Sequence, residues 1–350
     1  MNEVLIVTLL AILMGLVVGA VVLVLAGYNP AEAYKTMFLG IVSRPKYIGW
    51  TLVRSTPLIL TGLSVAFAFR TGLFNIGAEG QFMVGVLVAG VLGYVIELPA
   101  IIHLPLVIIG ATVAAGLYGG LAGYFKAKYG VHEVISTIML NWIALYFSNY
   151  MVYRPYLKNP QPEATYDIHE TARTTIDWLQ PLLGRSVKAN WGLAISIIVV
   201  IWVSYYLFKT VQGYELRAVG YNKDAAEYAG INVNNCIVKS MFIAGALAGL
   251  AGALHVTGVS FHVSKLAVSE GYGFNGIAVA LMGNNSPIGV LLCALLFGGL
   301  QYGGTKMGTL GVPSEVVSIV IGSIIFLIAI SKVFKPILKY INKAKGEVVK

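Results

Sequence analysis

Two short polar segments interrupt an otherwise apolar chain, and the first holds the side chains best suited to recognition or chemistry. Residues 70–81 contain three glycines together with Phe74, Asn75, Glu79 and Gln81. A carboxylate at the centre of a bilayer costs about 2.5–3.5 kcal/mol on insertion scales, so Glu79 is expected to face the protein interior or a water-filled path. The alternative is a plain turn between two helices, with Glu79 in a first helical turn where its charge favours the helix dipole.

The second segment repeats part of this pattern. Residues 271–278 contain Phe274 and Asn275, again followed by Gly and Ala. Interruptions at matching positions in two halves of a membrane protein indicate a transport path. Asn141 and Trp142 lie on an apolar stretch between the two segments. If all these residues line a path, their amides and aromatic rings suit a neutral, planar or hydroxyl-rich solute. The alternative for Asn141 is a hydrogen bond to a neighbouring helix.

The motifs of common enzymes are missing. The sequence has no Gly-Lys dipeptide and therefore no GxxxxGK[ST] phosphate-binding loop, and it has neither HExxH nor GxSxG. ATP hydrolysis, if the protein uses it, belongs to another chain. His255 is the one histidine expected inside a span, and packing is the favoured role for it. An ion-coupled carrier usually needs acids or histidines within the membrane, so that class is weakly supported.

Composition indicates the class of protein that positions these residues. Of 350 residues, 57% are hydrophobic and 11% charged, with a mean hydropathy of +0.79. Soluble domains carry about 25% charged residues, so the chain is expected to be a polytopic membrane protein. This composition excludes a disordered chain. Cys236 and Cys293 are the only cysteines, which excludes a disulfide-rich scaffold.

The apolar stretches predict an all-α protein with about ten transmembrane helices, since a crossing helix needs about 20 apolar residues. The first stretch lacks a basic leader and is too long for a signal peptide, so it is interpreted as a retained helix. Helices 2–5 and 7–10 are expected to form inverted repeats within a single domain over 1–350. The expected spans are residues 4–27, 50–70, 76–96, 104–125, 133–153, 191–209, 238–258, 270–283, 287–304 and 315–334.

Basic residues in short loops predict the orientation. They are frequent in 209–239, which holds Lys209, Arg217, Lys223 and Lys239, and in the tail 335–350, and Lys126 and Lys128 lie in the turn after the fourth span. In 154–190 acidic residues balance them. Residues 210–236 and 335–350 are therefore expected in the cytoplasm and 154–190 outside, with both termini cytoplasmic. The net charge of +9 then follows from topology, and no nucleic-acid partner is expected.

One short helix is expected within the cytoplasmic segment 210–236. Asp224 with Glu227 resembles a capping-box start, and Gly230 is a typical C-terminal stop. A helix this short is marginal in water by itself, so it is expected to dock on another protein. The alternative is a solvated connecting loop.

Three stretches together resemble a known family: Gly62–Gly85, Gly130–Asn141 and the segment from Arg217 to Ile231. They are similar to the permeases of ABC importers for ribose-type sugars, branched-chain amino acids and nucleosides. The form Phe-Asn-Ile-Gly-Ala-Glu-Gly-Gln looks most like the nucleoside (guanosine-type) branch. His132 departs from the pattern, which has Asn at that position.

The resemblance implies a ten-helix permease of the bacterial plasma membrane. It would pair with a second, homologous permease as a heterodimer, sit on ABC ATPase subunits and receive a small-molecule solute from an external binding protein. ATP and Mg²⁺ would bind the ATPase, leaving this chain without a cofactor. An ABC permease for a simple sugar or a branched-chain amino acid is the alternative within the class, and an ion-coupled secondary carrier is the alternative outside it. The expected ATPase-coupling residues are Arg217, Asn222, Asp224, Ala225, Glu227 and Gly230.

Overall fold

The computed structural model describes residues 3–159, 163–184 and 186–331, and the expected tail 335–350 lies outside them. Within these ranges the protein is all-α, with isolated β-bridges but no strand. Single helical turns are η1 (Glu170–Ala172), η2 (Asp177–Leu179), η3 (Val256–Ser260, a π-helix) and η4 (Gly308–Leu310). The α-helices are α1 (Glu3–Leu25), α2 (Pro30–Val42), α3 (Pro45–Arg70), α4 (Ala78–Val95), α5 (Ala100–Tyr129), α6 (Glu133–Val152), α7 (Gln180–Leu183), α8 (Gly192–Lys209), α9 (Val211–Tyr221), α10 (Lys223–Tyr228), α11 (Val233–His255), α12 (Tyr272–Met282), α13 (Pro287–Met307) and α14 (Ser314–Ala329).

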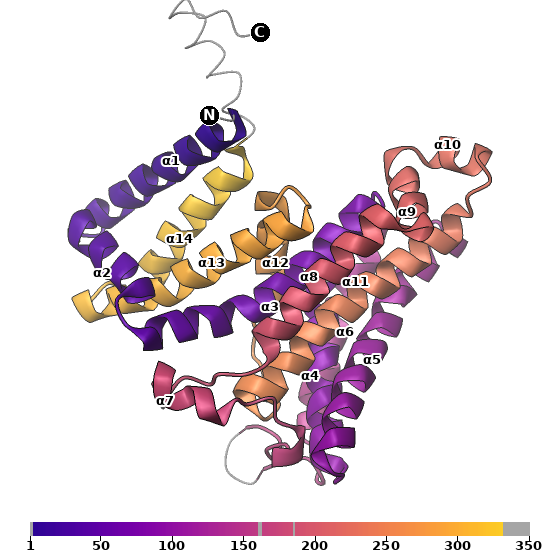
Figure 1. Ribbon diagram of the computed structural model, residues 1–350, viewed down its shortest axis with the longest axis horizontal. Coiled ribbons are helices and arrows are strands. Elements are labelled where there is room, and N and C mark those ends of the chain that lie inside the picture. Colours follow the sequence, from indigo (N-terminus) through magenta and orange to yellow (C-terminus); the bar gives the residue numbers. More distant parts are fainter. Residues whose placement is uncertain (1–2, 160–162, 185, 332–350) are drawn as a thin grey trace, which may run out of the picture. The chain divides into compact units, whose positions relative to one another are not determined.

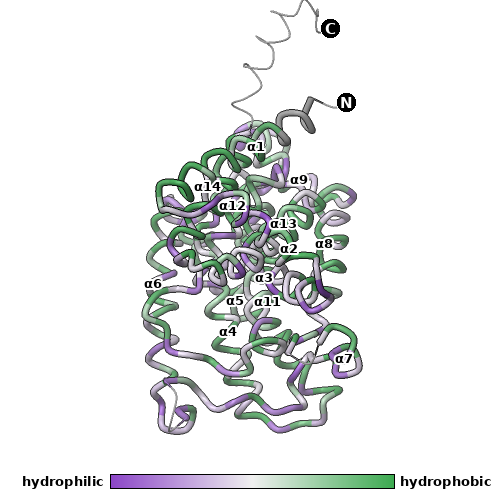
Figure 2. Tube along the Cα trace, turned by 90° about the vertical axis from the view of Figure 1, so that its left-hand side faces the viewer, coloured by the Kyte–Doolittle hydropathy of each residue, from purple (hydrophilic) through white to green (hydrophobic). Residues whose placement is uncertain are grey.

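An α-helix lies at every expected span, which confirms the all-α polytopic architecture. Six helices of the described ranges are long and apolar enough to cross a membrane, and shorter apolar helices accompany them. Hydrophobic residues dominate most helices, and hydrophilic ones are concentrated in the loops (Figure 2). Helix α2 was not among the expected helices, because it lies between the first two expected spans, 4–27 and 50–70. Asn29 caps it by accepting a hydrogen bond from the Ala31 N–H at 3.0 Å, directly before Pro30 at the first helical position.

The chain divides into two compact units, residues 52–295 and residues 1–51 with 296–350. In the second of these units α1 packs against α14, and a Cβ at Gly15 would lie 2.7 Å from Ile324 Cα. Tyr34 on α2 donates a hydrogen bond to the Leu16 carbonyl at 2.7 Å. These contacts join α1, α2 and α14 through close helix packing, which is the main source of helix association in lipid.

The unit 52–295 is built around α4, α5 and α11, and Figure 1 shows α5 and α11 running side by side. Glycines permit the close approach: a Cβ at Gly119 would lie 2.9 Å from Gly245 Cα, and one at Gly85 would lie 2.2 Å from the Gly249 carbonyl oxygen. Helix α8 is peripheral and exposes Ile198 and Ile201, a surface suited to hydrocarbon.

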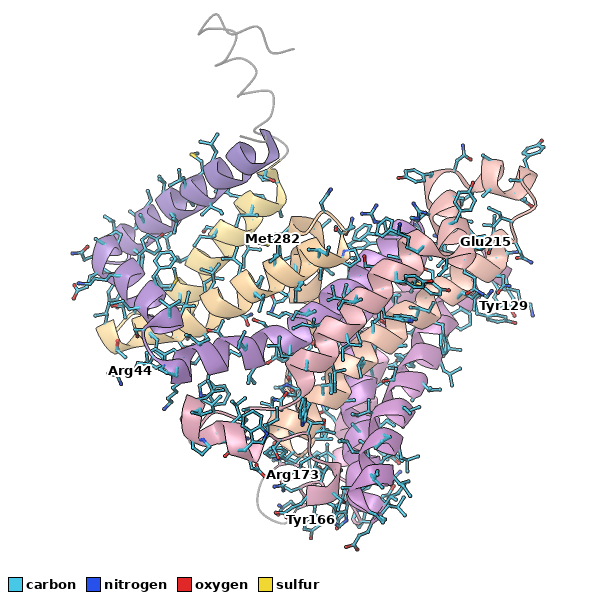
Figure 3. All side chains as sticks on the ribbon, viewed as in Figure 1. Arg44, Tyr129, Tyr166, Arg173, Glu215 and Met282 are labelled. Atoms are coloured by element: carbon cyan, nitrogen blue, oxygen red, sulfur yellow. The ribbon has the colours of Figure 1, made fainter. Side chains whose placement is uncertain are left out.

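The two long connections of this unit lie at opposite ends. Figure 3 shows Glu215 on α9 at one end and Tyr166 and Arg173 of the loop 154–190 at the other. That loop is well bonded to the segment after α11: Thr165 N–H donates to the Val263 carbonyl at 2.9 Å, and Ile168 N–H donates to the Phe261 carbonyl at 2.8 Å. The described residues of the loop that make these bonds therefore have a defined structure, which the mixed composition of the loop did not indicate.

Candidate functional site

The first polar segment covers the non-helical link 71–77 between α3 and α4 together with the first turn of α4, and its amides pair with one another. Asn75 is fully buried, and Gln81 is nearly so. Asn75 Nδ2 donates to Gln81 Oε1 at 2.8 Å, and Gln81 Nε2 donates to Asn75 Oδ1 at 3.0 Å. Asn75 Nδ2 also donates to Ser64 Oγ on α3 at 3.1 Å. The paired amides satisfy each other where water is excluded, as buried polar groups must.

Asn141 on α6 fastens the same link from the other side. Its Oδ1 accepts the Gly80 N–H at 2.8 Å, and its Nδ2 donates to the Ile76 carbonyl at 3.0 Å. The first N–H groups of a helix have no partner within that helix, and Gly80 N–H is one of them at the start of α4. Asn141 therefore makes the hydrogen bond to a neighbouring helix that was the alternative to a place in the path.

Glu79 joins the first polar segment to the second. Glu79 is fully buried, and its carboxylate lies at the N-terminus of α12. One oxygen accepts the Gly271 N–H at 2.7 Å, and the other accepts the N–H groups of Gly273 at 2.5 Å and Phe274 at 3.4 Å. A carboxylate is the favoured partner for the exposed N–H groups and the positive dipole end of a helix. The expectation that Glu79 faces the interior is confirmed.

Glycines in α12 make this contact possible. A Cβ at Gly273 would lie 2.2 Å from the Glu79 backbone nitrogen, and one at Gly276 would lie 2.6 Å from Thr61 Oγ1 on α3. Thr61 Oγ1 in turn donates to the Tyr272 carbonyl at 3.0 Å. The glycine-rich second segment thus packs α12 against both α3 and α4. Phe274 and Asn275 lie inside α12, so this segment is not a copy of the non-helical first one.

A cavity of about 270 Å³ adjoins this junction. Of the predicted site residues, Glu79, Asn141, Trp142 and Phe274 line it, whereas Phe74, Asn75, Gln81 and Asn275 do not. The remaining walls are mostly apolar. The full lining is Ile76, Glu79, Met83, Ile138, Asn141, Trp142, Leu145, Val268, Ser269 and Phe274.

The aromatic walls of the cavity are its accessible part. Trp142 is 50% exposed and Phe274 46%, while Asn141 is buried and already bonded on both sides. Trp142 also stacks on Tyr146, with ring centroids 6.0 Å apart. The cavity can therefore hold a flat apolar surface against aromatic rings more readily than it can offer new hydrogen bonds.

Before α11 begins at Val233, the segment 210–236 contains two helices, α9 and α10, where one was expected. Asn222, not Asp224, is the N-cap of α10, and its Oδ1 accepts the Ala225 N–H at 3.0 Å. Gly230 ends the helix as expected, with φ of +81°. Ile231 N–H bonds the Ala226 carbonyl at 3.0 Å and Gly230 N–H bonds the Glu227 carbonyl at 2.9 Å, which is a Schellman motif.

Helix α10 presents almost all of its surface outward. Ala226 is its buried residue, while Asp224, Ala225 and Glu227 are exposed and Tyr228 is 95% exposed. A six-residue helix this exposed lacks the burial that stabilises short helices, which favours the docking interpretation. Arg217 lies on α9 instead, with its guanidinium 5.1 Å from the centre of the Phe208 ring.

Glu133 was not among the predicted site residues. It begins α6, forms an ion pair with Lys126 at the end of α5, and accepts the Phe74 N–H at 3.4 Å. Its contacts hold the first polar segment next to α5 and α6. A sequence signal existed, since Lys126 and Glu133 flank the short turn between two apolar stretches.

The fold and this junction define a multi-pass membrane protein with a partly open cavity and a short exposed helix, α10. Residues 47–329 match the family described as branched-chain amino acid transport system / permease component, and the chain belongs to that family. It is therefore a transport subunit and not an enzyme.

Relatives with recorded functions extend over nearly the whole chain. A guanosine ABC transporter permease protein, NupP of Bacillus subtilis, is 43% identical over 97% of this chain and 97% of the relative. A nucleoside ABC transporter permease protein, NupB of Lactococcus lactis, is 40% identical over 95% and 92%. A glucose ABC transporter permease protein, TsgB13 of Haloferax volcanii, is 33% identical over 93% and 87%. Further permeases of the first two species, NupQ and NupC, are 29% and 30% identical over 72% and 71% of this chain.

Proposed function

We propose that this permease subunit serves an ATP-driven ABC importer and moves nucleosides into the cell by alternating access. The similarity to the guanosine and nucleoside permeases over at least 95% of the chain carries the proposal. The cavity supports it, because Trp142 and Phe274 offer stacking surfaces for a planar base. The proposed path residues are those expected from the sequence: Phe74, Asn75, Glu79, Gln81, Asn141, Trp142, Phe274 and Asn275.

The proposed architecture has ten spans, with helices 2–5 and 7–10 as inverted repeats and both termini in the cytoplasm. The loop 154–190 faces outside, where an external binding protein delivers the solute. Two similar permeases form a heterodimer, which the paired permease names in two relatives' species support. The junction of α4 and α12 lies at the interface between the halves of the repeat, where alternating access needs a movable contact.

ABC ATPase subunits bind the cytoplasmic segment 210–236 through α10, and they hold ATP and Mg²⁺. Asn222 begins α10 and Gly230 ends it, so α10 is a short helix with defined ends that can be bound by the ATPase. ATP shifts the permease pair between outward and inward access only through its different affinity for the two states of the assembly.

Reconstitution tests the function. The chain, its partner permease, the ATPase and the binding protein are assembled in vesicles, and uptake of radiolabelled guanosine, glucose and leucine is compared with and without ATP. We expect ATP-dependent uptake of guanosine. Uptake of glucose or leucine with no guanosine uptake would assign a different substrate, and uptake by this chain alone under an ion gradient would assign a different class.

Charge reversal tests the coupling helix. Asp224→Lys with Glu227→Lys changes two exposed side chains that cap nothing, so the spans should fold normally while the ATPase no longer co-purifies. Glu97→Lys is the matched control, because Glu97 is exposed at the opposite end of α4 from Glu79. Normal ATPase recovery and normal transport with the double variant would remove α10 from the coupling role.

A further inference from the structure

Two arginines converge on one polar cavity beside the segment 210–236. Arg70 ends α3 and Arg217 lies on α9, and their guanidinium carbons lie 5.5 Å and 5.1 Å from the centre of the Phe208 ring. Both arginines line a cavity of about 230 Å³. Its other lining residues are Phe69, Gly220, Tyr221, Asn284 and Asn285.

The backbone is arranged to bring these two cations together. A Cβ at Gly220 would lie 2.2 Å from the Arg70 carbonyl oxygen, so only glycine permits this approach of α9 to the end of α3. Gly72 faces Gly220 with φ of +72°, a conformation that favours glycine. Arg217, nearly one turn before Gly220, thereby lines the same cavity as Arg70. Two cations that share one cavity need compensation beyond the aromatic ring near both of them.

That compensation does not come from the part of the chain the structure describes. Within it, no carboxylate lies within ion-pairing distance of either arginine. Arg70 Nε donates to the Asn285 carbonyl at 2.9 Å. Arg217 Nε and Asn285 Oδ1 are buried without a hydrogen-bond partner among the described residues. Buried polar atoms normally have partners, so the cavity is built for a ligand with acceptor oxygens and at least one donor.

We propose that this cavity binds the phosphate of an anionic lipid headgroup, of the phosphatidylglycerol type. Guanidinium forks match the oxygens of a phosphate, and two of them supply the charge for it. A glycerol hydroxyl of the headgroup donates to Asn285 Oδ1, which a bare phosphate diester does not do.

A lipid is favoured over a soluble phosphate by the surface beside the cavity. Phe208, the ring under both guanidiniums, is 40% exposed at the end of α8. Ile201 and Tyr205 extend this exposed apolar surface along the same helix, where acyl chains can lie. The site rests on the proposed orientation, in which this end of α8 meets the cytoplasmic leaflet, where basic pockets bind anionic headgroups.

Lipid at this position would also act on the coupling segment. Helix α9 is followed directly by α10, with Asn222 as the shared residue between them. A phosphate held by Arg70 and Arg217 bonds α3 to α9 and so fixes the base from which α10 projects. The lipid therefore stabilises the docking position of α10.

The test uses the full transporter, purified and stripped of lipid. Phosphatidylglycerol or phosphatidylcholine is titrated in, and bound lipid is measured by native mass spectrometry with melting temperature as a second readout. Wild type should bind phosphatidylglycerol about tenfold or more tightly than phosphatidylcholine. Both lipids carry the phosphate, but phosphatidylcholine adds a cationic choline beside the two guanidiniums and lacks the glycerol hydroxyl that donates to Asn285 Oδ1. Arg217→Gln should remove that preference, and Arg217→Lys should keep part of it. Lys209→Gln is the matched control: it removes a nearby exposed charge that does not line the cavity, and the preference should persist.

Three results would overturn the assignment. Equal binding of the two lipids by wild type would show that no headgroup site exists, independently of any variant's folding. Inorganic phosphate that fills the site while phosphatidylglycerol does not would assign a soluble anion. Loss of ATPase co-purification in Arg217→Gln with unchanged lipid preference would assign an acidic partner side chain. Failure of nucleoside uptake would leave the lipid titration unaffected, so the two proposals fail separately.

Discussion

Replacing Glu79 with glutamine isolates the contact that joins α4 to α12. The glutamate uses both oxygens as acceptors for three backbone N–H groups, those of Gly271, Gly273 and Phe274. Glutamine has a single acceptor oxygen, and its NH₂ group would face the remaining N–H. At least one buried donor then loses its acceptor, which costs about 1–3 kcal/mol, and the other bonds lose their charge assistance.

The combined loss is about 2–4 kcal/mol, which corresponds to a roughly 30-fold to 700-fold larger population with α12 detached from α4. Hydrogen exchange measured by mass spectrometry on the assembled transporter should show faster exchange in peptides covering residues 270–276. Peptides from α5 and α11 should be unchanged, because their packing does not involve Glu79. Transport should fall more than the amount of folded protein.

Glu97→Gln is the matched control, since it makes the same chemical change at an exposed position at the other end of α4. It should leave exchange and transport unchanged. Unaltered exchange in 270–276 with Glu79→Gln would refute the capping role. An equal rise across α5 and α11, with equal loss of folded protein and transport, would show that Glu79 stabilises the whole unit rather than this joint.

Three further outcomes are expected. Trp142→Ala should raise the KM of nucleoside uptake about tenfold, because it removes one stacking surface worth about 1.4 kcal/mol. Phe147→Ala should leave KM unchanged, since Phe147 is exposed on the same helix but lies outside the cavity. Gly273→Ala should lower the melting temperature through overpacking of about 1–3 kcal/mol or more, whereas Gly322→Ala, with open space around it, should not. The hydrogen bond from the Lys265 ammonium lowers the pKa of Glu163, so this bond stabilises the loop at pH values above the ordinary carboxyl pKa and is lost as the pH falls through the lowered pKa. Hydrogen-exchange protection at residues 163–166 should therefore fall in acid, and Glu163→Gln should abolish that pH dependence.

The helices could be predicted from the sequence because a membrane imposes both a length and a composition on each span. The partners of the polar residues could not. Glu79 and Gly273 are separated by 194 positions, and nothing local indicates that one caps the helix containing the other. The sequence establishes only that a buried carboxylate needs partners. The repeated Phe-Asn pair was misleading locally, since Asn75 lies in a non-helical link and Asn275 lies within α12.

The start of α10 shows a finer limit. Asn222 and Asp224 are both good N-cap residues, and propensity does not separate them. The preceding helix decides between them: α9 continues to Tyr221, which leaves Asn222 extended, with φ of −158° and ψ of 113°. Its end was predictable because Gly230 is the one glycine in 221–231 and the left-handed position demands one. A helix end could thus be predicted where one residue fits the required position, and it could not be predicted where two residues fit equally well.

The polar groups of the proposed path are already used by the protein itself. Asn75 and Gln81 bond each other, Asn141 bonds α4, and Glu79 bonds α12. What remains accessible to a solute is mainly aromatic surface. Contacts of that kind tolerate many planar bases and hold each weakly, because no buried polar group is left unpaired when the wrong solute enters. The affinity and selectivity of uptake must then come from outside this chain, and the cavity is suited to passing a solute onward rather than retaining it. We therefore expect the permease pair without its binding protein to bind guanosine only weakly, in a titration where the binding protein alone binds it tightly.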